Sequence, residues 1–262
     1  MITFNMLGSY GRMGNQMFQY STLYSIAKTA GYEFGVSFRR TSENPYQNFY
    51  LPECFDNLSA KDSSHVINIH RAQERDFSYN AGIFGIPDNT DIFGYFQSEK
   101  YFKDYRNNIL KEFEFKPSIK EKAETLRAIT KEPVISLHLR LGDYLNLVGK
   151  HPVCSIEYYK NALKHLPNDM LIVAFSDDIV MAKQIFNSLG RKYFTPETNN
   201  QYVDMCLMTL CDYHVIANSS FSWWGAWLSN TKKVIAPAEW FGDSAEMPKN
   251  WSDIYCKNWI II

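Results

Sequence analysis

The sequence has 262 residues, which at about 150 residues per domain corresponds to one or two domains. Its 27 lysine and arginine residues against 28 aspartate and glutamate residues give a net charge of −1, which excludes a global basic field that would hold nucleic acid or an anionic membrane. Hydrophobic residues make up 45% of the chain and aromatic residues 16%, which excludes a disordered polypeptide. The aromatic excess has two explanations: a tightly packed core, which we favour, and surfaces that stack on flat partners such as sugar rings.

The chain carries no signal for a membrane or for secretion. No apolar run approaches the roughly 18 residues of a transmembrane helix, and residues 1–10 lack the features of a secretory signal. We therefore expect a soluble, cytoplasmic protein. Its five cysteines are odd in number and form no CxxC pair, so we expect buried, reduced thiols instead of a disulfide framework or a zinc site.

The first half opens with one βαβ unit. Alternating apolar residues predict strands over 2–6 and 34–38, a glycine-containing loop spans 8–14, and helical periodicity predicts a helix over 16–30 that Asn15 caps. Residues 40–115 are rich in Asn, Asp, Ser and aromatic residues, and no element is assigned there.

The second half alternates strands with helices. A capping-box spacing at Ser118 and Glu121 predicts a helix start. The predicted strands are 134–139, 171–175, 193–194, 214–217 and 234–236, and the predicted helices are 155–165, 179–189, 202–210 and 223–228. This alternation is typical of a parallel α/β sheet.

The chain is therefore predicted to be an α/β protein of two halves. The domains are 1–117 and 118–239; the tail 240–262 has no partner in its own half and packs back on the first domain. A cleft between two such halves is where a substrate would bind.

Three polar clusters follow three of the predicted strands. Arg140 to Asp143 follow strand 134–139, Ser176 to Asp178 follow strand 171–175, and Asn218 to Ser220 follow strand 214–217. Because the carboxyl ends of parallel strands meet at one edge of a sheet, where ligands bind, the three clusters converge on one place.

The side chains at this edge suit a nucleoside diphosphate. Arg140 can grip two phosphate oxygens, and Ser219 and Ser220 stand at a helix start, where the dipole favours anions. Asp177 has two acceptors for the N–H donors of a guanine edge, and His138 points to the same face as Arg140.

A structural interpretation stays open for each cluster alone. Arg140 and Asp143 could form a salt bridge, and Asp177 could cap the next helix. All three clusters together favour a binding site. The loop 8–14 has GxxGxxG spacing instead of GxGxxG, with no acidic residue near Phe38, which disfavours a dinucleotide oxidoreductase. It is either a plain turn before a helix or a loop that brings Asn15 to the cleft.

Four ordered motifs together resemble one family. They are GRMGNQMFQY at 11–20, HLRLGDY at 138–144, VCSIEYY at 153–159 and NSSFSWWGAWL at 218–228. The sequence resembles the α-1,2-fucosyltransferases of glycosyltransferase family 11. The resemblance implies a GT-B-like fold of two Rossmann-like domains and an inverting transfer of L-fucose from GDP-β-L-fucose to the 2-hydroxyl of a terminal galactose. It implies no obligatory metal and no cofactor beyond this donor, and it leaves the oligomeric state open.

The resemblance also implies that domain 1–117 is on the acceptor side, that domain 118–239 binds GDP-fucose, and that single residues have defined roles. Arg140 would hold the β-phosphate, with His138 and Asp143 in the donor site; Asp177 would read guanine; Ser219, Ser220 and Phe221 would line the pyrophosphate; and Asn15 would approach the leaving phosphate or the acceptor. The family usually has a second arginine where this chain has Leu141, which puts the role of that cation in doubt.

The general base is a separate question. His151 could accept the acceptor proton near neutral pH, although we favour an ordinary loop histidine, and a partly dissociative reaction could proceed without a base. A metal-dependent transferase is disfavoured because Asp177 and Asp178 are adjacent, so their carboxylates diverge.

Two expectations concern the aromatic residues. A non-catalytic carbohydrate-binding protein is the alternative function, with Trp223, Trp224 and Trp227 as a stacking platform, although their helical spacing is more typical of a buried face. The aromatic stretch 46–102, with Tyr95 and Phe96, is the candidate acceptor-facing surface. Association with a membrane could then occur through the acceptor glycan.

Overall fold

The computed structural model describes residues 1–38, 48–147 and 149–262. The chain forms two compact units: the first contains Met1–Lys116 and Asn250–Cys256, and the second contains Pro117–Lys249 and Lys257–Ile262. In the described part of the chain, no helix has the length and apolar character needed to cross a membrane.

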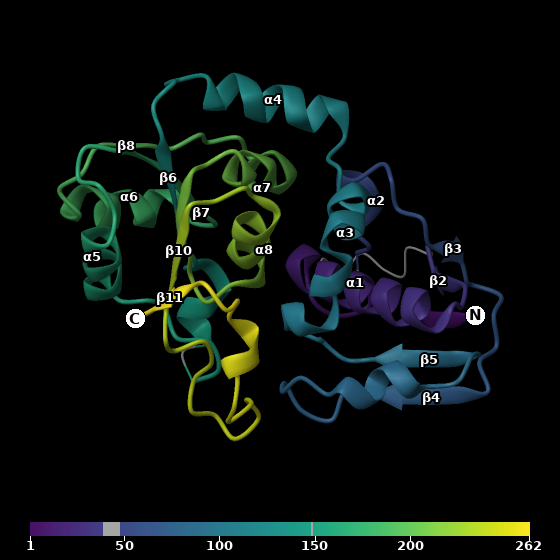
Figure 1. Ribbon diagram of the computed structural model, residues 1–262. Coiled ribbons are helices and arrows are strands. Elements are labelled where there is room, and N and C mark those ends of the chain that lie inside the picture. The colour runs from purple at the N-terminus through teal and green to yellow at the C-terminus, as the bar shows by residue number, and fades with distance from the viewer. Residues whose placement is uncertain (39–47, 148) are drawn as a thin grey trace. The chain divides into compact units, whose positions relative to one another are not determined.

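The first unit is built on a five-stranded parallel sheet (Figure 1). Its strands, in the spatial order β3-β2-β1-β5-β4, are β1 (Ile2–Phe4), β2 (Phe34–Val36), β3 (Lys61–Asp62), β4 (His70–Gln73) and β5 (Thr90–Phe93). Its helices are α1 (Met13–Ala30), α2 (Leu51–Cys54) and α3 (Arg106–Glu112), with short 3-10 turns at Ala81–Gly85, Glu99–Tyr101, Lys103–Tyr105 and Ser252–Ile254.

Helix α1 begins earlier than the sequence predicts. Its N-cap is Arg12, so Asn15 lies inside the first turn and the prediction that Asn15 caps the helix is wrong. Gly11 allows this start, because it turns the chain at a φ of 76°, a conformation that favours glycine. The helix is buried from Met13 to Ala27 except for Asn15, which explains why its apolar periodicity is weak.

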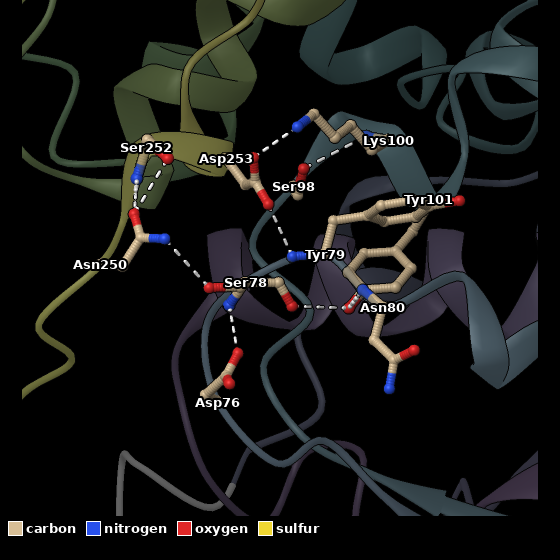
Figure 2. A network of polar contacts seen from close by, with 10 residues as sticks. All are labelled: Asp76, Ser78, Tyr79, Asn80, Ser98, Lys100, Tyr101, Asn250, Ser252 and Asp253. Atoms are coloured by element: carbon tan, nitrogen blue, oxygen red, sulfur yellow. Dashed lines mark hydrogen bonds and ion pairs between the residues drawn. The ribbon is translucent and has the colours of Figure 1, made fainter.

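A segment near the C-terminus belongs to the first unit (Figure 2). Asp253 accepts a hydrogen bond of 2.7 Å from the Tyr79 N–H and pairs with Lys100, while the Asn250 amide donates to the Ser78 hydroxyl at 3.3 Å. These contacts pin the loop that follows β4. Of the predicted tail 240–262, only this segment groups with the first unit.

The second unit carries a six-stranded parallel sheet. Its strands, in the order β11-β10-β9-β6-β7-β8, are β6 (Val134–Leu139), β7 (Leu171–Ser176), β8 (Tyr193–Phe194), β9 (Tyr213–Val215), β10 (Lys233–Ala236) and β11 (Ile260–Ile261). Its helices are α4 (Pro117–Arg127), α5 (Ile156–Lys164), α6 (Ile179–Ser188), α7 (Gln201–Thr209) and α8 (Ser220–Leu228), with a 3-10 turn at Gly142–Asn146.

Two details of this unit differ from the prediction. Strand β11 pairs in parallel with β10, so the expectation that the tail has no partner in its own half is wrong for Ile260–Ile261. Helix α4 begins at Pro117, a residue that suits the first helical position, so Ser118 lies inside the helix and does not form the predicted capping box.

Helices cover both faces of the second sheet. Figure 1 shows α5 and α6 on one side of it and α7 and α8 on the other. Side chains alternate along β6: Ile135, Leu137 and Leu139 belong to the core with α5 and α6, whereas His138 contacts α8. The strand exits of this sheet therefore stand on a rigid, fully packed base.

The packing beneath α6 generates a stability prediction. Phe186 is 1% exposed in the core, whereas Val180 on the same helix is 76% exposed. We expect Phe186→Ala to lower the free energy of unfolding by about 3–5 kcal/mol, because it removes a buried ring and leaves a cavity. The matched Val180→Ala should change it by less than about 0.5 kcal/mol. Urea unfolding of the full chain measures both, and equal effects would contradict this account of the core.

Candidate active site

Polar side chains gather at the carboxyl-terminal edge of the second sheet. Strand β6 lies between β7 and β9, with Leu139 paired to Ser176 and Leu137 to Val215. The segments that leave these three adjacent strands therefore start side by side. The structure thus brings together the three clusters that the sequence singles out.

Arg140 is held between two carboxylates. Its Nη1 lies 2.8 Å from Oδ2 of Asp177, and its Nη2 lies 2.6 Å from Oδ1 of Asp143. The guanidinium also stands over the ring of Tyr144, 5.1 Å from the centroid, and the side chain is 13% exposed. Its Nε is buried and has no hydrogen-bond partner among the described residues. An unpaired buried donor of a charged group marks a place where an anion would be favourable.

The Asp177 carboxylate bonds to the segment that leaves β6. One oxygen accepts the Leu141 N–H at 2.9 Å, and the other faces Arg140. Gly142 leaves room for this, since a Cβ there would lie 2.3 Å from the Asp177 carboxylate. The alternative that Asp177 caps the next helix is wrong, because Asp178 caps α6. The guanine-reading role stays a prediction for a carboxylate already bonded to Arg140.

Leu141 occupies the position of the second arginine that the family resemblance implies. It is 2% exposed and belongs to the apolar core with α5 and α6. A cation at this position would be buried among apolar groups. Leu141 therefore contributes packing to the core. The positive charge at the end of β6 comes from Arg140.

His138 lies beneath this edge as a buried neutral group. It is 4% exposed, its Nδ1 is 2.9 Å from the Ser222 hydroxyl, and its ring lies 5.7 Å from that of Phe221. Burial, with a smaller contribution from the Arg140 charge, lowers the pKa of His138 to about 3. His138 therefore carries no charge at neutral pH and acts through hydrogen bonding and packing.

Ser219 and Ser220 form the start of helix α8, as the sequence predicts. Ser219 is the N-cap, and its hydroxyl accepts the Phe221 N–H at 3.3 Å. Ser219 is buried, whereas Ser220 and Phe221 are half-buried. The exposed side of this first turn, with the positive end of the helix dipole, suits an anion.

Tyr144 is a site residue that sequence reasoning missed. Arg140 stands over its ring, and the ring of His151 stacks against it at 4.8 Å and 15°. The Tyr144 hydroxyl donates to the Asn218 carbonyl at 3.1 Å, which ties the exits of β6 and β9 together. The only signal was its place within the HLRLGDY motif, four residues after Arg140.

His151 packs beside this cluster. Its ring contacts Tyr144 and lies 5.8 Å from the ring of Phe241, and its Nδ1 is buried without a partner among the described residues. Burial lowers the pKa of His151. The imidazole is therefore neutral at physiological pH, and its role as a base stays a prediction.

Asn15 stands at the corresponding edge of the first unit. Its Oδ1 accepts a hydrogen bond of 2.7 Å from the Gln97 amide, and Gln19, one turn along α1, donates to the Gly94 carbonyl at 3.1 Å. Gln16 bonds to the carbonyls of Gly11 and Asn48. The polar residues of the N-terminal motif therefore hold the loops at this edge.

The structure tests both expectations about the aromatic residues. Phe96 is 1% exposed and packs on Phe4 and Tyr101, so its assignment to an acceptor-facing surface is wrong, whereas Tyr95 is half-buried. Tyr46, at the start of the predicted stretch, lies outside the described residues. The three tryptophans of the alternative stacking platform are buried, with exposures of 0%, 0% and 4% for Trp223, Trp224 and Trp227. Their faces pack within the second unit, which contradicts the carbohydrate-binding platform.

All five cysteines have free thiols; four are buried and Cys154 is half-buried. Within residues 1–38, 48–147 and 149–262, no three His, Cys, Asp or Glu side chains are grouped so as to hold a metal ion.

Comparison with known proteins defines the class. The profile of glycosyl transferase family 11 matches residues 2–262. The chain is 31% identical to an alpha-1,2-colitosyltransferase of Escherichia coli, with 88% of this chain and 90% of that protein covered. It is 26% identical to the galactoside 2-alpha-L-fucosyltransferase SEC1 of Bos taurus, with 87% of this chain and 65% of that protein covered. The protein is thus a sugar-transferring enzyme. It belongs to glycosyl transferase family 11.

Solved structures agree with this class at the level of the fold. The fucosyltransferase NodZ from Bradyrhizobium, in crystals soaked with GDP-fucose, superposes with a TM-score of 0.56 at 14% identity, covering 95% of this chain and 97% of NodZ. POFUT1 in complex with GDP superposes with a TM-score of 0.54 at 12% identity, covering 99% and 97%. The two parallel-sheet units are GT-B-like, as the sequence predicts.

The buried state of His138 can be tested directly. Because its pKa is lowered to about 3, we expect the imidazole to stay neutral between about pH 5 and pH 8. The unfolded chain takes up this proton near its ordinary pKa of about 6.5, so acidification below that value should lower the free energy of unfolding. NMR of the imidazole nitrogens, assigned with His138→Gln, measures the titration. A midpoint between about pH 5.5 and pH 7 would contradict the buried, neutral state.

Proposed function

We propose that this protein transfers L-fucose from GDP-β-L-fucose to the 2-hydroxyl of a terminal galactose, with inversion at the fucose C1. The observation that carries the proposal is the Arg140 guanidinium, which two carboxylates fix at the exit of β6 and whose buried Nε has no partner among the described residues. The names of the relatives support the linkage, since they are α-1,2-colitosyl and galactoside α-1,2-fucosyl enzymes.

The reaction needs positive charge where GDP departs. As the bond between C1 and the β-phosphate oxygen breaks, negative charge grows on the diphosphate, and a preorganised donor aimed at that charge lowers the barrier. Arg140 supplies this donor from a fixed position, and the backbone N–H groups at the start of α8 supply the helix dipole. In this mechanism the arginine supplies the cation, so a metal ion is not required.

The two carboxylates on Arg140 are positioning groups in this proposal. Asp143 and Asp177 each take one terminal nitrogen, so the guanidinium cannot rotate and presents a defined edge to the diphosphate. The Tyr144 ring packs against the guanidinium, and the His151 ring stacks on Tyr144. The hydrogen bond between His138 and Ser222 joins the end of β6 to α8.

A matrix of donors and acceptors tests the function. GDP-fucose, GDP-colitose, GDP-mannose and UDP-sugars are each offered with galactose-terminated and other glycosides, and the product linkage is determined. We expect transfer from GDP-fucose to the 2-hydroxyl of galactose, with activity retained in EDTA. Transfer from GDP-colitose alone, or any product linked elsewhere, would overturn the assignment of donor or acceptor.

The Arg140 role yields a quantitative prediction. We expect Arg140→Ala to lower kcat/KM by about 10²- to 10³-fold, the usual effect of losing one preorganised donor. Arg140→Lys should recover little, because lysine keeps the charge but cannot form the two-pronged contact.

The matched control is Arg127, which pairs with Asp212 at the opposite edge of the same sheet and bonds to the Leu210 carbonyl. Arg127→Lys should keep kcat/KM within about threefold of the wild type, since it lies away from the strand exits. Near-normal kinetics of Arg140→Lys would contradict the proposed role of Arg140.

A further inference from the structure

A carboxyl group stands at the carboxyl-terminal edge of the first sheet. Glu74 directly follows β4, and its carboxylate accepts the N–H groups of Tyr95 (2.6 Å) and Phe96 (3.0 Å), which follow β5. No lysine or arginine in the described part of the chain forms an ion pair with it. Glu74 is therefore a carboxyl held only by backbone amides, at the edge where parallel sheets bind ligands.

The loop after β5 is bent around this carboxyl. Phe96 adopts a φ of 51°, in the left-handed region that a bulky residue rarely occupies. A Cβ at Gly94 would lie 2.4 Å from the Cβ of Glu74. Backbone strain of this kind persists where the surroundings hold it in place and is concentrated at functional sites.

The segment that carries Glu74 is also held from its other side. The loop at 76–80 is pinned by Asp253 and Asn250, as Figure 2 shows. The Tyr101 hydroxyl accepts the Asn80 N–H at 3.0 Å. Contacts on both sides therefore fix the carboxyl in one position, which acid-base chemistry requires.

Half-buried aromatic residues lie in the loops that flank the carboxyl. The ring of Tyr95 packs edge-on against Tyr10 at 5.2 Å and nearly parallel to Phe77 at 5.7 Å. The Tyr10 hydroxyl bonds to both backbone groups of Gly94, within the same bent loop. Half-buried aromatic residues near a carboxylate are a combination that suits a sugar, because its C–H face packs on rings and its hydroxyls bond to carboxylate oxygens.

The protonation state of Glu74 suits a proton acceptor. Burial raises its pKa to about 7, and the nearby Asp76 charge adds to this, against the opposing effect of the two backbone N–H groups. The Glu74 charge also acts on the phenols of Tyr10, Tyr95 and Tyr101, and burial raises the pKa of each. A base is most effective when its pKa lies near the working pH.

We propose that Glu74 is the general base that accepts the proton of the acceptor hydroxyl as its oxygen attacks the fucose C1. This inference rests on the proposed function. The oxygen–C1 bond forms as the bond from C1 to the β-phosphate oxygen breaks; the hydroxyl proton passes to the Glu74 carboxylate, and the electron pair leaves with GDP.

The variant Glu74→Gln tests this role, because its amide oxygen still accepts the backbone N–H groups. With GDP-fucose and a galactoside, we expect kcat to fall by about 10²- to 10⁴-fold, the usual contribution of a general base, while the Kd of GDP stays within about twofold. The wild-type kcat/KM should rise with pH through an apparent pKa near 7. This loss of activity below the apparent pKa is the acid limb of the pH profile, and Glu74→Gln should lack it. Glu74→Asp, which keeps the carboxyl, should retain the limb at reduced kcat.

The matched control is Asp204, a second carboxyl whose pKa burial raises, to about 6, and which bonds to Thr198 in the second unit. Asp204→Asn should retain the acid limb. The inference is overturned if Glu74→Gln keeps both the acid limb and the wild-type kcat. It is overturned equally if Asp204→Asn loses the acid limb and kcat to the same extent as Glu74→Gln. It is also overturned if His151→Gln alone removes the limb. Absence of transfer by the wild type would instead overturn the proposed function.

Discussion

The second unit depends on one constraint: a largely buried arginine must be neutralised without losing the ability to bind an anion. Arg140 meets it through two carboxylates, Asp143 from its own loop and Asp177 from the exit of the neighbouring strand. An isolated buried cation would cost several kcal/mol, which the carboxylates offset, and Gly142 leaves room for that of Asp177. The central place of β6 in the sheet supplies the partner strand that this arrangement needs.

In the first unit, polar residues also gather at the carboxyl-terminal edge of its own sheet. Its loops are joined by hydrogen bonds from buried amide and hydroxyl groups, notably Gln19 and Tyr10 to Gly94 and Gln97 to Asn15. Glu74 is the carboxyl within this network. In the proposed reaction, one unit supplies a fixed cation for the departing diphosphate and the other supplies the proton acceptor. The near-zero net charge of −1 fits this division, because the anionic donor is met locally.

Prediction from sequence succeeded where strands are buried and failed where they are short and polar. Strand 134–139 was predicted with its observed bounds, because its apolar residues, interrupted only by Ser136 and His138, are typical of a buried central strand. Strand β4 was missed because its residues, His70–Gln73, are polar and mostly exposed at a sheet edge. Arg140 was found from its place after a strand, whereas the role of Tyr144 depends on ring contacts and that of Glu74 on a loop 20 residues away. Such contacts have no periodicity to reveal them.

The central claim is that Arg140 holds the diphosphate of the donor while both carboxylates stay on the guanidinium. A crystal structure of the protein with GDP tests it most directly. The account predicts a β-phosphate oxygen about 3 Å from a nitrogen of Arg140, with Asp143 and Asp177 still paired to the terminal nitrogens. A diphosphate bound away from Arg140, or an Arg140 that leaves both carboxylates to reach it, would contradict the account.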